Sequence, residues 1–455
     1  MQSYHRRSAV SNETQLRARC QEALQLTKRH GADEVEIYAQ AARVLSADIE
    51  KHDLQTATSQ QETMVGVRAF INHQVGFACT NVLDELETAC ADAVKLAKAS
   101  PRDVNNVLPA PVPFEPVANL YDPSAESFSI SDAVQRAIRM IETAEAIDCR
   151  LVVGGGAFSS HLQMRCIVNS RGIELTEKSS LFTYHAIVTA KDKEMVSNMA
   201  FDFDASHSVN AINVVPVATR ACRDALGSLG AERGESFVGP IILSPAAVRD
   251  ILVEVLAFQL NAKNVLRGAS RWGDSLGNLV ASTSLTVTDD GRLRNGVSTK
   301  SFDREGMPHR EVHLIESGVA SQLMHNTYTS VAMGASNTSH SSGSARSVPN
   351  ISPTNLLIKP GIPSREELIG GIKQGLLVSS FSGSSNPISG DFSGVAKAAT
   401  LIKNGKLDRP VTGTLIAGNV FEVLQSLSGV SSETERVFSS VLPYVRLEGV
   451  SVTAE

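Results

Sequence analysis

Apolar positions along the first hundred residues follow two periods, which predict helices and strands in turn. A capping segment at 12–15 precedes apolar residues spaced three and four apart, and this predicts a helix that ends near Gly31. Alternation in DEVEIYAQ (33–40) predicts a strand, and strand-like sequence continues over 47–80. A second helical pattern occupies 81–100, so the chain begins with a small α/β unit.

A second unit with a similar alternation of patterns begins near Ser129. An amphipathic helix comes first, and strand-like sequence with tight turns follows from 151 to 192. Within it, Gly154 to Gly156 follow a strand, but more strand comes next, whereas a phosphate-binding loop needs the N-terminus of a helix. We therefore predict a hairpin turn at these glycines. A last helix, over 209–229, closes the unit.

Proline marks the passage between these two units. The stretch from Pro101 to Ser124 carries six prolines, which remove backbone donors and disfavour helix in the residues before them. We interpret it as an extended connector. From Val238 onward, a few helical patterns are mixed with many short strands separated by Gly, Asn, Asp and Pro, and Ser364 to Glu367 forms a capping box.

These patterns predict an α+β fold, with N-terminal α/β domains followed by a large C-terminal domain rich in antiparallel β-strands. The predicted division is an N-terminal α/β domain (1–105), a Pro-rich linker (106–125), a second α/β domain (126–235) and a β-rich C-terminal domain (236–455). Two Ser/Gly-rich stretches, 334–350 and 379–394, interrupt the last domain. Long loops inside a compact domain are usually functional or disordered, and both interpretations stay open here.

Composition excludes several classes of protein. A chain of 455 residues with 42% hydrophobic and 20% charged residues is typical of a globular protein of about three domains. The net charge of −6 is mild and no Lys/Arg block stands out, so a nucleic-acid surface is not indicated. The first residues contain no apolar segment typical of a signal peptide, and no run of about 18 apolar residues predicts a membrane span.

The cysteines show no metal-binding or disulfide pattern. None forms a CxxC pair and none lies after position 222. We expect all of them to be buried free thiols in a reducing cytoplasm. They are Cys20, Cys79, Cys90, Cys149, Cys166 and Cys222.

His309 and His313 are spaced as the two histidines of a zinc helix would be. On a helix they would share a face, but Gly306 to Pro308 come just before them and EVHLIESG alternates as a strand does. Along a strand, residues four apart are about 13 Å apart, whereas two nitrogens on one zinc lie about 3.4 Å apart. We therefore predict that this pair lies in a strand and holds no metal.

Several blocks of the chain, taken in their order and spacing, resemble the TldD/PmbA family from about residue 35 to the end. They are GVRAFINHQVGFACTN (66–81), NSRG (169–172), DREGMPHREVHLIESGVASQLMHNTYTSVAMG (303–334), PTNLLIKPG (353–361) and GDFSGVAKAATLIKNGKLDRPVTGTLIAGN (390–419). The resemblance implies a cytoplasmic protein linked to zinc-dependent peptide cleavage. TldD-type members carry His-Glu-x-x-x-His on a helix early in the last domain and a cysteine ligand near the C-terminus. PmbA-type (TldE-type) partners lack these ligands, and the two together enclose a cleft for an extended, unfolded peptide.

ILVEVLAFQL (251–260) stands where the resemblance places the zinc helix. The two histidine positions fall on Val253 and Phe258, and the glutamate position falls on Glu254. A slip in the alignment changes nothing, because no histidine lies between His207 and His309 and no cysteine follows Cys222. Val and Phe offer no donor to zinc. Phe258 is expected to pack in the core, and Glu254 either lies on the exposed or interfacial edge of the helix or contacts peptide or a partner in the cleft.

The resemblance therefore implies a PmbA/TldE-like subunit of a zinc metalloprotease complex that processes or degrades unfolded peptides. No cofactor is expected in this chain, and zinc is expected only in a TldD-like partner. The expected partners are that subunit in a heterodimer, or a second copy in a homodimer, and an extended peptide, with no membrane and no direct nucleic acid. Residues expected at the peptide cleft are Gly334, Asn337, Gly390 and Asp391.

Two other classes of function remain open. One is a homodimeric peptide-binding or regulatory protein without a catalytic partner. The other is a protease active alone, which would use His309 and His313 or a serine of the Ser/Gly-rich stretches. Those stretches give no visible Ser-His-Asp arrangement in the sequence. A genomic neighbour with His-Glu-x-x-x-His would favour the subunit.

Overall fold

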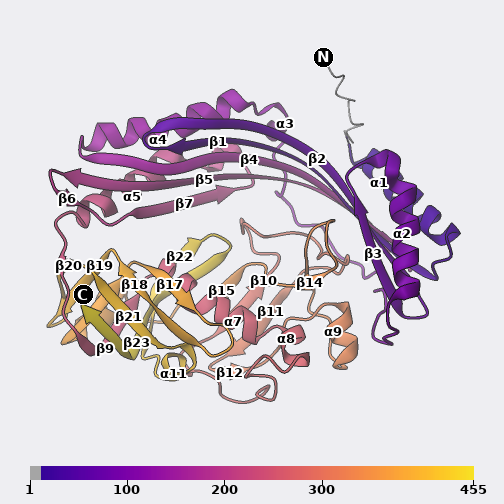
Figure 1. Ribbon diagram of the computed structural model, residues 1–455. Coiled ribbons are helices and arrows are strands. Elements are labelled where there is room, and N and C mark those ends of the chain that lie inside the picture. Colours follow the sequence, from indigo (N-terminus) through magenta and orange to yellow (C-terminus); the bar gives the residue numbers. More distant parts are fainter. Residues whose placement is uncertain (1–11, 455) are drawn as a thin grey trace.

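Two large β-sheets, each carrying helices, make up the computed structural model, which describes residues 12–454 (Figure 1). The first sheet has seven strands, in the order β3-β2-β1-β4-β5-β6 with β7 also beside β5. It arches over the second unit, with α4 (Ile130–Ile147) and α5 (Val214–Gly227) along its outer side and α1 (Glu13–Arg29) and α2 (Leu86–Ala99) at the other end (Figure 1). Its strands are β1 (Glu34–Glu50), β2 (Asp53–Ile71), β3 (Gln74–Thr80), β4 (Leu151–Asn169), β5 (Glu174–Asp192), β6 (Met195–Val196) and β7 (Ala200–Ser206).

The helices of the first sheet begin where the sequence places capping residues. Asn12 caps the first helix by accepting a hydrogen bond from the backbone N–H of Gln15, and Ser129 forms a capping box with Asp132. Both predicted helix starts are therefore confirmed. The helical segments are α1 (Glu13–Arg29), η1 (Leu83–Glu85), α2 (Leu86–Ala99), α3 (Ser124–Ser127), α4 (Ile130–Ile147), η2 (Val209–Ala211) and α5 (Val214–Gly227).

Strands β1 and β4 join the first two predicted units into one sheet. They pair antiparallel from Glu36 opposite Asn169 to Glu50 opposite Gly155. The residue boundaries predicted for the domains stay a prediction. What the pairing shows is that the strands before and after the proline-rich connector share one sheet and lie opposite the same C-terminal unit (Figure 1).

The predicted hairpin turn at Gly154 to Gly156 is wrong. These glycines lie inside β4, where the register with β5 shifts between Val153 and Gly155. Close packing explains the last glycine, because a Cβ on Gly156 would lie 2.5 Å from Cε of Met140 in α4. Gly156 thus lets α4 approach the strand closely, and the chain does not turn at these glycines.

The second sheet has fourteen strands and is mostly antiparallel, as predicted for the C-terminal unit. Its path runs β12-β11-β10-β15-β23-β9-β16-β19-β20-β8, with β17, β18, β21 and β22 attached beside it. Its strands are β8 (Glu232–Arg233), β9 (Phe237–Leu243), β10 (Val287–Asp290), β11 (Glu311–Glu316), β12 (Val319–Ala320), β15 (Leu356–Ile358), β16 (Gln374–Val378), β17 (Ser380–Ser385), β18 (Asp391–Lys397), β19 (Ala399–Lys403), β20 (Lys406–Thr412), β21 (Thr414–Asn419), β22 (Gly429–Val437) and β23 (Ser440–Ala454).

A few short helices and one small hairpin complete the C-terminal unit. Ser364 caps α10 in a capping box with Glu367, which confirms that prediction. The hairpin pairs β13 (Ser341–Ser342) with β14 (Asn350–Ile351). The helical segments are α6 (Pro245–Val248), η3 (Arg249–Val253), α7 (Glu254–Gln259), α8 (Ala262–Leu266), α9 (Thr327–Ala332), α10 (Arg365–Gly370) and α11 (Val420–Gln425).

The two Ser/Gly-rich stretches differ in structure. Residues 380–385 and 391–397 are not a loop but two paired strands, β17 and β18, with Gly383 opposite Gly394. A Cβ on Gly383 would lie 2.6 Å from Cα of Gly394, so both glycines serve close strand contact. The other stretch, 334–350, is largely irregular, but residues 338–341 within it are buried.

The cysteines do not all follow the prediction of burial. Cys20, Cys90, Cys166 and Cys222 are buried free thiols as expected, whereas Cys79 and Cys149 are free but exposed. Separately, none of the helices between residues 12 and 454 combines the length and apolarity needed to cross a membrane.

Candidate functional site: the helix after strand β9

The helix expected from the resemblance to correspond to a zinc helix follows strand β9, whose last three residues are buried and which also pairs antiparallel with β23. Strand β9 pairs parallel with β16, and Ser244 then caps α6 by accepting a hydrogen bond from the N–H of Ala247, with Pro245 at the first helical position. The helix continues as a π-helical turn, η3, and ends as α7. A π-turn inside a helix is rare and often marks a functional position.

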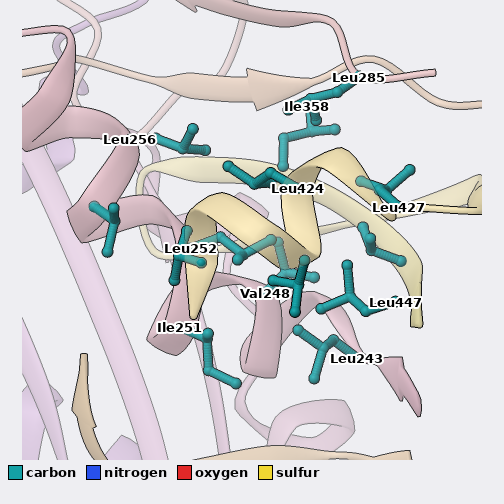
Figure 2. Packing of buried hydrophobic residues seen from close by; sticks show 14 of the residues in the cluster. Leu243, Val248, Ile251, Leu252, Leu256, Leu285, Ile358, Leu424, Leu427 and Leu447 are labelled. Atoms are coloured by element: carbon teal, nitrogen blue, oxygen red, sulfur yellow. The ribbon is translucent and has the colours of Figure 1, made fainter. Parts of the chain in front are cut away.

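One side of this helix is firmly built into the core of the C-terminal unit. Figure 2 shows Val248, Ile251, Leu252 and Leu256 packed with leucines from α11, β9 and β23. Side chains at these helix positions are completely buried. Burial of apolar side chains of this size stabilises the fold by about 1.5–3 kcal/mol each, so the position of the helix is set by its packing.

The three residues aligned with the zinc motif lie elsewhere on the helix. Val253 is half-buried and packs against the edge of the core, and Glu254 is exposed. The side chain of Glu254 makes no hydrogen bond or ion pair with any residue from 12 to 454. Phe258 is half-buried and is not part of the core, so the expectation that it packs there is wrong. The core-facing positions of this turn are Val255, Leu256, Gln259 and Leu260, and Phe258 lies on the opposite side of the helix.

The donor set at this helix does not fit zinc. Val253 and Phe258 have no donor atom, and Glu254 alone leaves at least two protein ligands missing from a site that usually has three or four. Within the described part of the chain, no group of three or more His, Cys, Asp or Glu side chains is arranged to hold a metal ion. No step of a reaction can therefore be assigned to a metal on these residues.

Of the two histidines His309 and His313, only His313 lies in a strand as predicted, because β11 begins at Glu311 and His309 lies before it. His313 belongs to β11 and pairs with Thr288, while the backbone N–H of His309 donates to the carbonyl of Ser301. His313 is exposed and lies 3.5 Å from Glu316, whereas His309 is buried. Burial, followed by the positive charge of Arg165, holds the pKa of His309 well below its usual value. The two imidazoles are therefore in different surroundings and do not form one site.

A triad-like arrangement that the sequence did not reveal lies next to this segment. His340 Nε2 is 3.0 Å from Asp289 Oδ2, and His340 Nδ1 is 2.9 Å from Thr338 Oγ1. All three side chains are buried, and Thr338 Oγ1 also hydrogen-bonds to the backbone of His325. A nucleophile needs access to its substrate, so we interpret this network as structural. It explains why residues 338–341 are buried despite their polar sequence.

Buried charges join the two sheets above this region. Glu36 of β1 is hydrogen-bonded to Arg68 of β2 and to Arg304, which precedes β11 in the C-terminal unit. Arg68 also contacts Glu305 at 3.0 Å, and Glu305 accepts a hydrogen bond from the N–H of Thr327 at the start of α9. Burial raises the pKa of Glu36, but Arg68 and Arg304 outweigh this effect and the pKa is lowered. The network fixes how the arched sheet is seated on the C-terminal unit.

The residues expected at a peptide cleft are divided between two places. Asn337 lines a cavity of about 550 Å³ together with His309 and connector residues. Gly334 is exposed just after α9, with a φ of 61°. Gly390 forms the turn before β18, and the side chain of Asp391 accepts a hydrogen bond from Asn419 at 2.8 Å. The structure does not bring the two pairs together, and their role in peptide binding stays a prediction.

Family comparisons match three consecutive stretches of the chain. They are PmbA/TldA metallopeptidase domain 1 over residues 35–97, the PmbA/TldA metallopeptidase central domain over residues 123–229, and the PmbA/TldA metallopeptidase C-terminal domain over residues 237–454.

Two proteins of Haemophilus influenzae are similar to the chain over most of its length. A Metalloprotease TldD homolog is 25% identical over 422 residues, which is 89% of this chain and 86% of that protein. A Metalloprotease PmbA homolog is 22% identical over 432 residues, which is 93% of each chain. Similarity thus extends to both types of relative and does not by itself separate them.

A solved structure confirms the fold. TldE from Thermococcus kodakarensis superimposes with a TM-score of 0.88 at 24% identity, covering 96% of this chain and 100% of that one. The match supports the mixed α/β architecture of two sheets described above.

Proposed function

This chain belongs to the PmbA/TldD metallopeptidase family, and from that we propose that it is a TldE-like, non-metal-binding subunit of a cytoplasmic zinc metalloprotease complex that processes unfolded peptides. In this complex a TldD-like chain carries the zinc, and the present chain completes the substrate cleft. Zinc would there lower the pKa of a bound water molecule for peptide hydrolysis.

The observation that carries the proposal is the chemistry of the helix after β9. The residues aligned with the family's zinc motif are Val253, Glu254 and Phe258, of which only the exposed Glu254 has a donor atom. The apolar side of the same helix is well packed (Figure 2). The helix is therefore a stable part of the fold, and in this proposal it corresponds to the family's metal helix without the metal ligands.

A free strand edge supports the idea of an extended substrate. Strand β3 pairs with β2 only from Val65 to Ile71, so among residues 12–454 the segment 53–64 of β2 has β1 on one side and no strand on the other. These residues are mostly exposed and polar. Backbone hydrogen bonding to such an edge tolerates many sequences, which suits a subunit that handles unfolded chains.

Metal content and activity test the proposal directly. When the untagged chain is purified from its native host, a second protein that contains His-Glu-x-x-x-His is expected to co-purify with it. Mass spectrometry should then find zinc in samples that contain the partner. The present chain purified alone should hold well below one zinc per molecule. Cleavage of an unfolded casein peptide should require both chains.

Each other outcome points to a different function. Stoichiometric, chelator-sensitive zinc in this chain alone would refute the subunit role and indicate a metalloprotease active by itself. A stable homodimer that binds peptide, with no partner recovered, would indicate a regulatory or peptide-binding protein instead.

A further inference from the structure

A cavity of about 600 Å³ lies where the first sheet meets helices α8 and α9. Its wall takes Arg68 and Val75 from β2 and β3, Asn105 and Asn106 from the connector, and Tyr328 from α9. None of the described residues that line it is an Asp or a Glu, whereas three are cations. A pocket lined by charges of one sign concentrates ligands of the opposite sign.

Two of the cations lack an opposite charge within the described part of the chain. Lys263 and Arg267 stand four residues apart, so they lie on one side of the α8 turn. Neither forms an ion pair with a residue between 12 and 454, and Lys263 Nζ has only the neutral Asn350 Oδ1 at 3.5 Å. Burial, and then the positive charge of Arg267, lower the pKa of Lys263. An anion between the two would relieve this repulsion.

The other charges near the cavity leave its positive character in place. Arg68 is neutralised within the buried network, where Glu36 and Glu305 balance Arg68 and Arg304. Asp103 reaches the wall through the hydroxyl of Tyr328, at 2.7 Å. The negative charge of Asp103 is therefore outnumbered by the positive charges of Lys263 and Arg267.

The rest of the wall suits a peptide chain better than a small inorganic ion. Val75, Leu266 and Val348 form an apolar part of the wall. Asn326 accepts a hydrogen bond from the N–H of Thr329 through Oδ1, and its side-chain N–H groups donate to no residue in the described range. Apolar surface with a few fixed polar groups is typical of sites that bind organic ligands.

We propose that this cavity binds the C-terminal end of an extended peptide, with the α-carboxylate on Lys263 and Arg267 and the last side chain against Val75, Leu266 and Val348. A charge-assisted pair with Arg or Lys is the strongest kind of hydrogen bond available to a carboxylate. The identification of the ligand as a peptide rests on the proposed function. Recognition of a chain end would orient a substrate without reading its sequence.

Short peptides with and without a free carboxylate test this inference on the full-length chain. Acetyl-Ala-Ala-Ala-Val as the acid and as the amide, and the amide of acetyl-Ala-Glu-Ala-Val, are titrated by calorimetry. The acid is expected to bind at least about tenfold more tightly than either amide, because one to two charge-assisted hydrogen bonds are lost on amidation. In the double variant Lys263→Gln, Arg267→Gln, the acid should bind no better than the amide. The variant Lys359→Gln removes an exposed lysine away from the cavity and should bind as the wild type does.

Several results would overturn the inference. They are equal binding of acid and amide, unchanged binding by the double variant, tight binding of the internal glutamate peptide, stronger binding of inorganic phosphate than of the acid peptide, or no binding at millimolar concentration. Equal melting temperatures for wild type and the double variant exclude misfolding as the cause of a loss. The titration needs neither zinc nor a partner, so its failure is distinct from failure of the subunit proposal, which metal content and co-purification decide.

Discussion

Arg304 Nη1 donates a hydrogen bond of 2.8 Å to Glu36 Oε1, and this contact between buried side chains connects the C-terminal unit to the first strand of the arched sheet. The same carboxylate is shared with Arg68. Removing one member of a buried charge network leaves the others desolvated and unpaired, which is costly. The relative position of the two sheets thus depends on a few charged side chains as well as on apolar packing.

Replacing Glu36 by Gln should destabilise the protein by about 3–5 kcal/mol, since two arginines would lose their buried partner. Urea unfolding followed by circular dichroism measures the change. Glu34→Gln is the matched control, because Glu34 lies two residues earlier on β1 and pairs with Arg171 at the surface. Surface pairs contribute about 0–1 kcal/mol, so equal losses in the two variants would contradict a special role for Glu36.

Asp303 should make stability fall as pH rises through the neutral range. Burial, then the nearby charge of Glu305, raise the pKa of Asp303 to about 8, although backbone N–H groups of Met307, Glu305 and Ser341 oppose the shift. Between the ordinary carboxyl pKa near 4 and about 8, the folded chain binds more protons than the unfolded chain does, so this group destabilises the fold progressively as pH increases.

The variant Asp303→Asn isolates this effect. The difference in unfolding free energy between variant and wild type, measured by urea titration from pH 5 to pH 8, should shift in favour of the variant as pH rises. His309 and His325, whose pKa values are lowered mainly by burial, act in the opposite direction below pH 6.5, and the subtraction removes their contribution. A pH-independent difference would mean that Asp303 is ionised throughout.

Gly156→Ala should destabilise the protein by about 1–3 kcal/mol through overpacking, because the new methyl group would meet the Met140 side chain at 2.5 Å. Gly154→Ala is the control, since the nearest atom to its new Cβ lies 3.9 Å away. Adding Met140→Ala to Gly156→Ala should relieve only the contact with the methionine, because the new Cβ would still lie 2.7 Å from the backbone carbonyl oxygen of His185. Equal melting temperatures for the two single variants would show that α4 can shift freely over β4.

The contrast between Gly156 and Ser129 indicates what the sequence could predict. Ser129 and Asp132 act within one helical turn, so a local pattern was sufficient to place the start of α4. The need for glycine at position 156 arises from the side chain of Met140, sixteen residues earlier in a packed helix. The local sequence does not distinguish such a glycine from one in a turn. The same holds for Gly383 and Gly394. They lie in a Ser/Gly-rich segment typical of a loop, but they belong to two closely paired strands.

The candidate site shows the same limit. The absence of donors at Val253 and Phe258 follows from residue identity alone and needed no structure. The contact of Arg304 with Glu36 joins residues 268 positions apart, and the cavity beside Lys263 is lined by residues from β2, β3 and the connector. No short motif encodes such contacts, because each charged residue by itself resembles an ordinary surface residue.

Introducing Val253→His and Phe258→His around Glu254 should not create a zinc protease. Residues five apart on an α-helix are separated by about 140° around its axis, and the π-turn that would bring such a pair closer ends at Val253. The two imidazoles would therefore point in different directions, and neither a third ligand nor the groups that orient metal-bound histidines are in place.

The double variant should thus hold little zinc, cleave no unfolded peptide alone, and unfold about 1–2 kcal/mol more easily than the wild type, because both replaced side chains are half-buried. The pair Val253→Ala, Phe258→Ala separates the loss of packing from any effect of the imidazoles, and Glu254→Gln, at an exposed position, should leave stability unchanged. Zinc content, melting temperature and cleavage of an unfolded peptide are measured for all three. Stoichiometric zinc in the histidine variant but not in the alanine variant would reveal a ligand on a neighbouring element and a metal site that the fold still supports.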